Sequence, residues 1–153
     1  MTRLVVDASV VVTAICSRWR RRGGGTRPPS SAIVLRMVHL GLAESLVSDE
    51  IEAEWRRVVE YDYPRKMAPA RQRRAVVEAL VRASRRVSPA TMAGAVPGDP
   101  SDEIYVAAAG AGGATHLLTW DEGHLTPLDG KWGFRILTPA AFVTGLRAGR
   151  SGS

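Results

Sequence analysis

Apolar residues occur along the chain in short runs that predict four strands. The first run, residues 4–12, is broken by Asp7, Ala8 and Ser9. It predicts a short buried strand over residues 3–7 that carries Asp7 at its carboxyl end. Residues 43–47, 116–119 and 135–137 predict the other three strands.

Amphipathic segments between these strands predict helices. Ser48 is expected to cap a helix whose apolar residues share one face at the 3.6-residue period, namely Ile51, Trp55, Val58 and Val59. Further helices are expected over residues 32–40, 70–87, 102–109 and 139–146. Ser31 is the expected cap of the first of these, which ends at Gly41, and Ser101 is the expected cap of the third.

Three segments carry turn signals instead. Residues 18–31 hold three glycines, two prolines and a cluster of arginines, which predicts a loop. Residues 61–69 are expected to form a turn around Pro64, and residues 88–100 a loop. Strands that alternate with helices predict an α/β fold, a three-layer α/β/α sandwich with a mostly parallel central sheet. We expect one domain over residues 1–148 and a frayed tail over residues 149–153.

Length and composition exclude several classes of protein. A chain of 153 residues, 45% hydrophobic and 24% charged, has the makeup of one globular domain, which excludes wholesale disorder. No segment approaches the roughly 18 apolar residues that a membrane span needs. Asp7 interrupts the amino-terminal apolar run, which argues against a signal peptide. A single cysteine, Cys16, suits a cytoplasmic location.

The charge balance raises the question of nucleic-acid binding. The net charge is +6, and 19 of the 21 basic residues are arginines. Arginine binds phosphate bidentately, so Arg18, Arg20, Arg21 and Arg22 are candidate substrate-binding residues, and the arginines of residues 71–86 could also guide an RNA backbone. A GC-rich coding sequence gives the same excess of arginine, so charge alone leaves nucleic-acid contact open.

Four acidic residues stand where they could face one cleft at the carboxyl ends of the strands: Asp7, Glu54, Asp102 and Asp121. Singly, each has a plainer explanation, since Asp102 could complement a helix dipole, Glu54 could be solvated and Asp121 could belong to a turn. Two carboxylates about 4 Å apart repel by roughly 4 kcal/mol, so a group of four would need cations. Oxygen ligands suit Mg²⁺ or Mn²⁺, and such ions promote phosphoryl displacement, which predicts a nuclease.

Four segments in order then carry a family resemblance: VVDASVVV, LVSDEIEAEWRRVV, GDPSDEIYVAAAGAGGATHLLTWD and RILTPAAFV. The sequence resembles PIN-domain proteins and is similar to VapC-like toxins and related toxin-component PIN proteins. The resemblance covers most of the chain. It implies an α/β/α sandwich and an Mg²⁺- or Mn²⁺-dependent ribonuclease with one or two ions. Its catalytic and metal-binding acids would be Asp7, Glu54, Asp102 and Asp121, supported by Ser9, Asp99 and Thr119.

The resemblance also implies roles and partners. Asp7 and Asp102 would hold the main ion with Glu54 on its other side, and Asp121 would complete a second site or orient the attacking water. The family commonly has another acid at the position of Gly123, which leaves the number of ions open; His124 beside it is interpreted as incidental. The implied partners are RNA, a small antitoxin and a second copy of the chain. The alternative is a PIN-like binding module with weak or no catalysis.

Overall fold

The computed structural model describes residues 1–20 and 29–151 and contains one parallel sheet. Five strands lie in the order β3-β2-β1-β4-β5, and every neighbouring pair is parallel. The strands are β1 (Arg3–Val6), β2 (Glu44–Val47), β3 (Ser84–Arg86), β4 (His116–Leu118) and β5 (Arg135–Leu137). The predicted α/β sandwich and its four predicted strands are confirmed, and β3 is an addition.

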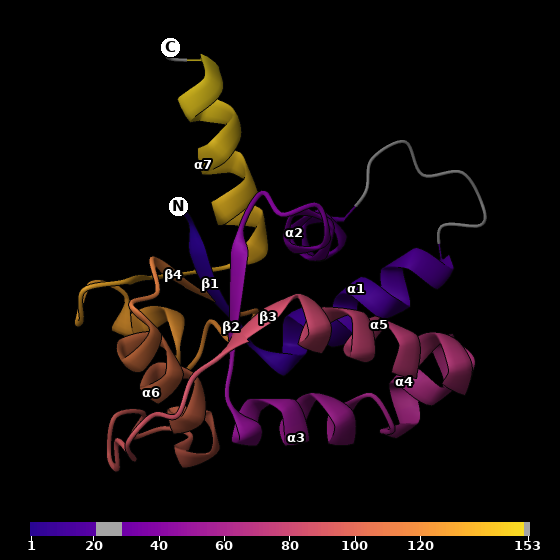
Figure 1. The fold of residues 1–153 in the computed structure, drawn as a ribbon, viewed down its shortest axis with the longest axis horizontal. Coiled ribbons are helices and arrows are strands. Elements are labelled where there is room, and N and C mark those ends of the chain that lie inside the picture. The colour runs from indigo at the N-terminus through magenta and orange to yellow at the C-terminus, as the bar shows by residue number, and fades with distance from the viewer. Residues whose placement is uncertain (21–28, 152–153) are drawn as a thin grey trace.

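Helices cover both faces of this sheet. They are α1 (Ala8–Arg20), α2 (Ser30–His39), α3 (Asp49–Val58), α4 (Asp62–Met67), α5 (Ala70–Ala83), α6 (Glu103–Gly112) and α7 (Pro139–Ser151). Figure 1 shows α6 on one side of the sheet and α1, α2 and α5 on the other. Right-handed crossovers explain this division, because the chain moves outward from β1 to β3 and then returns through α6 to β4.

The hydrophobic core lies on both sides of the central strand β1 and its neighbour β4. Leu4, Val5 and Val6 of β1 have no exposed surface, nor do Leu117 and Leu118 of β4. Burial on both faces explains why these strands are uninterrupted apolar runs in the sequence. Helix α6 packs so closely against the sheet that a Cβ at Gly112 would lie 2.5 Å from the side chain of Leu46 in β2.

The predicted start of α2 is wrong. Residues 18–20, expected to be in a loop, belong to α1, and the helix after the gap begins at Ser30 with Pro29 as its cap. Ser31 is buried and does not cap. Its Oγ lies 2.6 Å from Thr13 Oγ1 and accepts a hydrogen bond from Trp120 Nε1 at 2.8 Å. The Ser31 hydroxyl, expected to cap the helix, therefore makes hydrogen bonds with Thr13 and Trp120 instead.

Two segments around α5 also differ from prediction. Residues 62–67, expected to be a turn, form the short helix α4. Pro64 is tolerated there because the first turn of a helix needs no backbone N–H donor. The predicted helix 70–87 ends at Ala83, and residues 84–86 form the edge strand β3. Its sequence, Ser-Arg-Arg, lacks apolar alternation because two of its three residues are exposed.

The remaining differences concern helix ends. Ser101 does not cap; instead Asp99 accepts from the Ser101 N–H at 3.1 Å, which starts the turn η2 (Pro100–Asp102) ahead of α6. The helix predicted over residues 139–146 continues to Ser151. These shifts move the start of α6 by one residue and leave Asp102 immediately before it.

Candidate functional site

Asp7 occupies the carboxyl end of the central strand β1. Its backbone N–H donates to Leu118 O at 3.0 Å, which fixes it between β1 and β4. Its Oδ2 accepts hydrogen bonds from Thr119 Oγ1 at 2.5 Å and from Ser9 Oγ at 3.0 Å. The residue is only 7% exposed, and burial raises the pKa of its carboxyl although these hydroxyls act in the opposite direction. A desolvated carboxylate of this kind is stabilised by a nearby cation.

The two hydroxyls next to Asp7 join it to the loop after β4. Thr119 Oγ1 donates to Asp7 and accepts from the Asp121 N–H at 2.9 Å. Ser9 Oγ donates to Asp7 and accepts from the Trp120 N–H at 3.0 Å. Both hydroxyls therefore orient Asp7, and they fix the start of the segment that carries Asp121.

Asp102, which precedes α6, and Asp121, in the loop after β4, are hydrogen-bonded to each other at the carboxyl edge of the sheet. Burial, the charges of Asp7 and Asp99 and a hydrogen bond with Asp121 raise the pKa of Asp102 to about 8. Burial also disfavours the charged form of Asp121, but the backbone N–H groups of His124 and Gly123 and the hydrogen bond from Asp102 outweigh it and lower its pKa. Without a cation, a pKa of about 8 leaves most of the Asp102 carboxyl protonated at neutral pH.

Glu54 reaches this region from α3. The predicted cap is confirmed, since Ser48 Oγ accepts from the Ile51 N–H at 3.2 Å. The helix is anchored by Trp55, whose Nε1 donates to Val6 O at 3.0 Å. The Glu54 side chain is 24% exposed and pairs with Arg57. Its charge acts on the phenol of Tyr105, as do those of Asp7 and Asp102.

Tyr105 is a site residue that sequence reasoning missed. Its hydroxyl accepts from the Ala8 N–H at 3.2 Å, and its ring is buried. Burial and the charges of Asp7, Glu54 and Asp102 raise the pKa of the phenol well above its ordinary value. Tyr105 lies three residues after Asp102, and this helical spacing is the signal that could have identified it.

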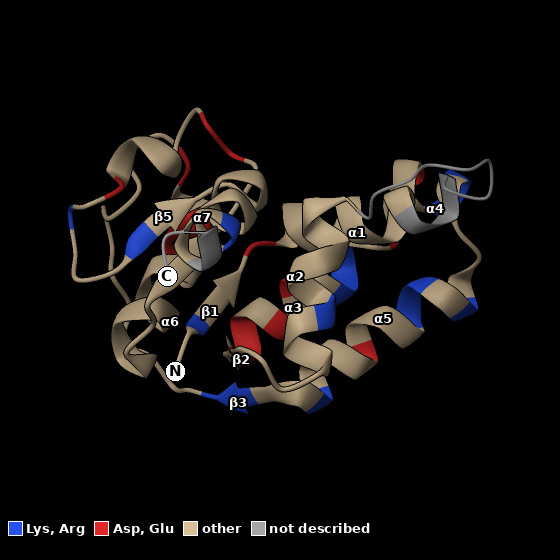
Figure 2. Cartoon of the chain, turned by 90° about the horizontal axis from the view of Figure 1, so that it is seen from above, with Lys and Arg blue, Asp and Glu red and all other residues tan. Residues whose placement is uncertain are grey.

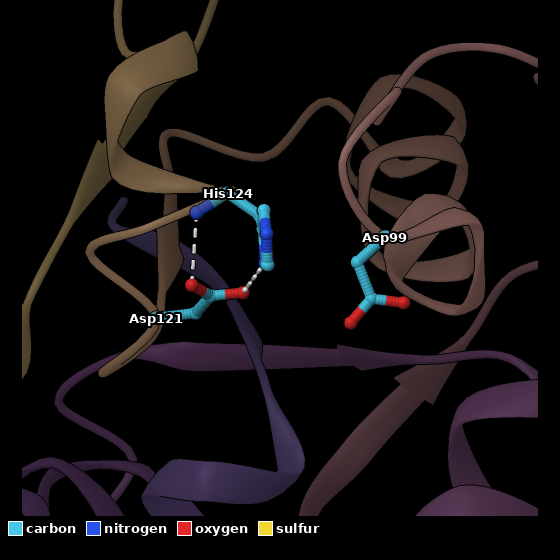
Figure 3. Close-up of side chains that lie close together, drawn as sticks. All are labelled: Asp99, Asp121 and His124. Carbon is cyan, nitrogen blue, oxygen red and sulfur yellow. Dashed lines mark hydrogen bonds and ion pairs between the residues drawn. The ribbon is translucent and has the colours of Figure 1, made fainter.

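Asp99 and His124 extend the group on its outer side. One ligand atom from each of Asp99, Asp121 and His124 lies within 4.8 Å of the others (Figure 3). His124 Nδ1 is 3.4 Å from Asp121 Oδ2, and the His124 N–H donates to Asp121 Oδ1 at 2.9 Å. His124, interpreted from the sequence as incidental, therefore has Asp121 as a partner.

The basic residues are dispersed. Figure 2 shows Lys and Arg along α5 and at β3, where several pair with acids. Arg74 pairs with Glu60, Arg82 with Glu78, and Arg86 with Asp49 and Glu52. The predicted phosphate contacts of Arg21 and Arg22, and those of the Arg18 and Arg20 side chains, lie outside the described residues. The described arginines of residues 71–86 are therefore weaker candidates for RNA contact than their number suggests.

The donors at the carboxyl edge fit a divalent cation. Asp7, Asp102 and Asp121 supply only oxygen, and Asp102 holds a proton because of its burial and, next, the nearby charges of Asp7 and Asp99. Hard ions such as Mg²⁺ and Mn²⁺ bind through a few carboxylates of this kind and keep waters for a substrate. Asp7 and Asp102 could hold such an ion, because burial makes the charged form of each carboxyl unfavourable and a bound cation would offset that cost.

Without divalent ions, the free energy of unfolding should fall as the pH rises from about 5 to about 8. Asp102 loses its proton near its ordinary pKa of 3.8 in the unfolded chain but near 8 in the folded protein. The folded state therefore binds more protons across this window, and stability falls with rising pH. Urea unfolding in EDTA at several pH values measures this slope. Asp102→Asn should flatten it, and an equal slope in both proteins would contradict the prediction.

The comparisons with known proteins agree with this arrangement at the level of the family. Within the described residues, no helix is both long and apolar enough to cross a membrane. A search among curated proteins finds no match. The PIN domain family matches residues 3–123, a stretch that runs from β1 through β4 and includes all of the acids described above. Because this match covers well over half of the 153 residues of the chain, the chain belongs to the PIN domain family.

Proposed function

We propose that this protein is an Mg²⁺- or Mn²⁺-dependent endoribonuclease. PIN domains are in general metal-dependent nucleases that act on nucleic acid. The observation that carries the proposal for this chain is the meeting of Asp7, Asp102 and Asp121 at one edge of the sheet, where burial and repulsion favour a cation. A nuclease needs such an ion next to the phosphate that it cleaves.

Each acid has a role in this proposal. Asp7 and Asp102 would hold the main ion, with Glu54 on its other side. Asp121 would complete a second position or orient the attacking water. Thr119 and Ser9 keep the Asp7 carboxylate in one orientation through their hydrogen bonds. When bound, the ion lowers the pKa of water and neutralises charge on the scissile phosphate.

Cleavage of a pool of structured RNA tests the proposal. We expect purified protein to cleave with Mn²⁺ or Mg²⁺ and not with EDTA, and Asp102→Asn to lower the rate at least about a hundredfold, roughly 2.7 kcal/mol of barrier. Asp62→Asn is the matched control, because Asp62 is an exposed acid in the first turn of α4. RNA binding without cleavage by folded protein under either ion would instead favour the binding module.

We further propose that the protein is the toxin of a toxin–antitoxin pair. A groove of about 860 Å³ between α2 and α5 supports a protein partner, since it is lined mainly by apolar residues such as Ile33, Leu35 and Val76. Arg36 in its lining favours an antitoxin segment that carries both apolar and acidic side chains. Addition of such an antitoxin to the cleavage assay should stop the reaction. A homodimer is also proposed, and light scattering of the purified protein tests it.

A further inference from the structure

His124 lies beside the carboxyl group of Asp121 and packs against the backbone of Gly98. Its backbone N–H donates to Asp121 Oδ1, and its ring nitrogen Nδ1 approaches the other oxygen of the same carboxylate at 3.4 Å. In Figure 3 the Asp99 carboxyl group lies across the gap from this pair. The three side chains come from the segment before α6 and the loop after β4, on opposite sides of the gap.

The ring of His124 also packs directly on the backbone next to Asp99. A Cβ at Gly98 would lie 2.3 Å from His124 Cδ2 and 3.1 Å from Nε2, so only glycine permits this approach. The ring is therefore held between Gly98 and Asp121 even though the side chain is 47% exposed. This close packing is an observation independent of the acids, and it directs the imidazole toward them.

The spacing of the donor atoms fits a shared metal ion. Two ligands bound to one first-row ion at about 2.1 Å each are separated by roughly 3 to 3.4 Å, the separation found between His124 Nδ1 and Asp121 Oδ2. One oxygen of Asp99 lies within 4.8 Å of a ligand atom of each of the other two residues. Gly123 offers no side chain at this point, and His124 joins Asp121 as a loop residue with a ligand atom in the group.

We propose that Asp99, Asp121 and His124 form a mixed nitrogen and oxygen site that binds a first-row transition-metal ion in preference to Mg²⁺. The proposal deepens the proposed function, on which it rests, by assigning a second cation position and its selectivity. Mg²⁺ binds through oxygen ligands and dehydrates reluctantly, whereas imidazole is a good ligand for first-row transition ions. The oxygen-only position at Asp7 and Asp102 lacks this selectivity.

Electron paramagnetic resonance with Mn²⁺ alone as the probe tests the site without any need for activity. Bound Mn²⁺ in the wild-type protein should show spin-echo modulation from a directly coordinated imidazole nitrogen. His124→Ala should abolish this modulation and weaken the binding of one Mn²⁺ equivalent at least about tenfold, while leaving Mg²⁺ binding unchanged. His39→Ala is the control, because His39 is an exposed histidine at the end of α2.

A second variant separates ligation from a general effect on the loop. Gly98→Ala keeps the imidazole but displaces its ring, so it should also weaken binding of that Mn²⁺ equivalent. Absence of nitrogen modulation in the wild-type protein, or an unchanged Mn²⁺ affinity in His124→Ala, would overturn the site and leave His124 as an ion-pair partner of Asp121. RNA cleavage that depends on Asp7 would then still support the nuclease. Nitrogen modulation in a protein that cleaves no RNA would support the site and refute the nuclease.

Discussion

Replacement of Asp7 by asparagine should lower metal-dependent RNA cleavage at least about a thousandfold, which corresponds to roughly 4 kcal/mol of transition-state stabilisation. Asp7 is the most buried of the acids, and Thr119 and Ser9 hold its carboxylate in one orientation. An amide is neutral and a weaker ligand, so the main ion would lose its best-oriented charged oxygen. Steady-state cleavage rates at saturating Mn²⁺ measure the effect.

The same substitution should leave the metal-free protein as stable as wild type or more stable. Burial of the Asp7 charge is unfavourable, as the raised pKa shows, and the asparagine carbonyl can still accept from both hydroxyls. Thermal unfolding in EDTA measures this second outcome, with Asp62→Asn as the exposed control. Retention of cleavage would refute the assignment of Asp7 to the ion. A large loss of stability would contradict the view that its charge is costly.

The position of the acidic group could be predicted because it follows from topology. Asp7 and Asp121 follow the apolar strands β1 and β4, and the carboxyl ends of parallel strands meet at one edge of a sheet. Asp102 precedes a helix that runs back along the sheet, which puts its first turn at that same edge. Local apolar patterns therefore suffice to place these residues near one another.

Contacts between distant segments could not be predicted in the same way. The Tyr105 hydroxyl meets the Ala8 N–H across 97 residues of sequence, and nothing near either residue indicates the pairing. The approach of His124 to Asp99 depends on the missing side chain of Gly98, which reads in the sequence only as part of a loop. The strand β3 was missed because its edge position leaves its arginines exposed. Pairing with β2 defines it, and that pairing is not a local property.

Trp55 is expected to be the residue whose truncation most destabilises the fold and, through it, the site. The side chain has no exposed surface, and Nε1 donates to Val6 O, the residue just before Asp7. Trp55→Ala should therefore cost about 3–5 kcal/mol in the free energy of unfolding, because it leaves a large cavity in the core. Urea unfolding followed by circular dichroism measures the loss.

Two further variants separate the volume of this residue from its hydrogen bond. Trp55→Phe fills most of the cavity but leaves the Val6 carbonyl without its donor, which should cost about 1–3 kcal/mol. Trp132→Ala removes a partly buried indole that stacks on Phe134 and should cost less than Trp55→Ala. If Trp55→Phe lowers Mn²⁺ affinity as well as stability, the hydrogen bond to Val6 also positions Asp7. If its Mn²⁺ affinity equals that of wild type, Trp55 supports the fold alone, and the orientation of Asp7 depends on the Thr119 and Ser9 hydroxyls.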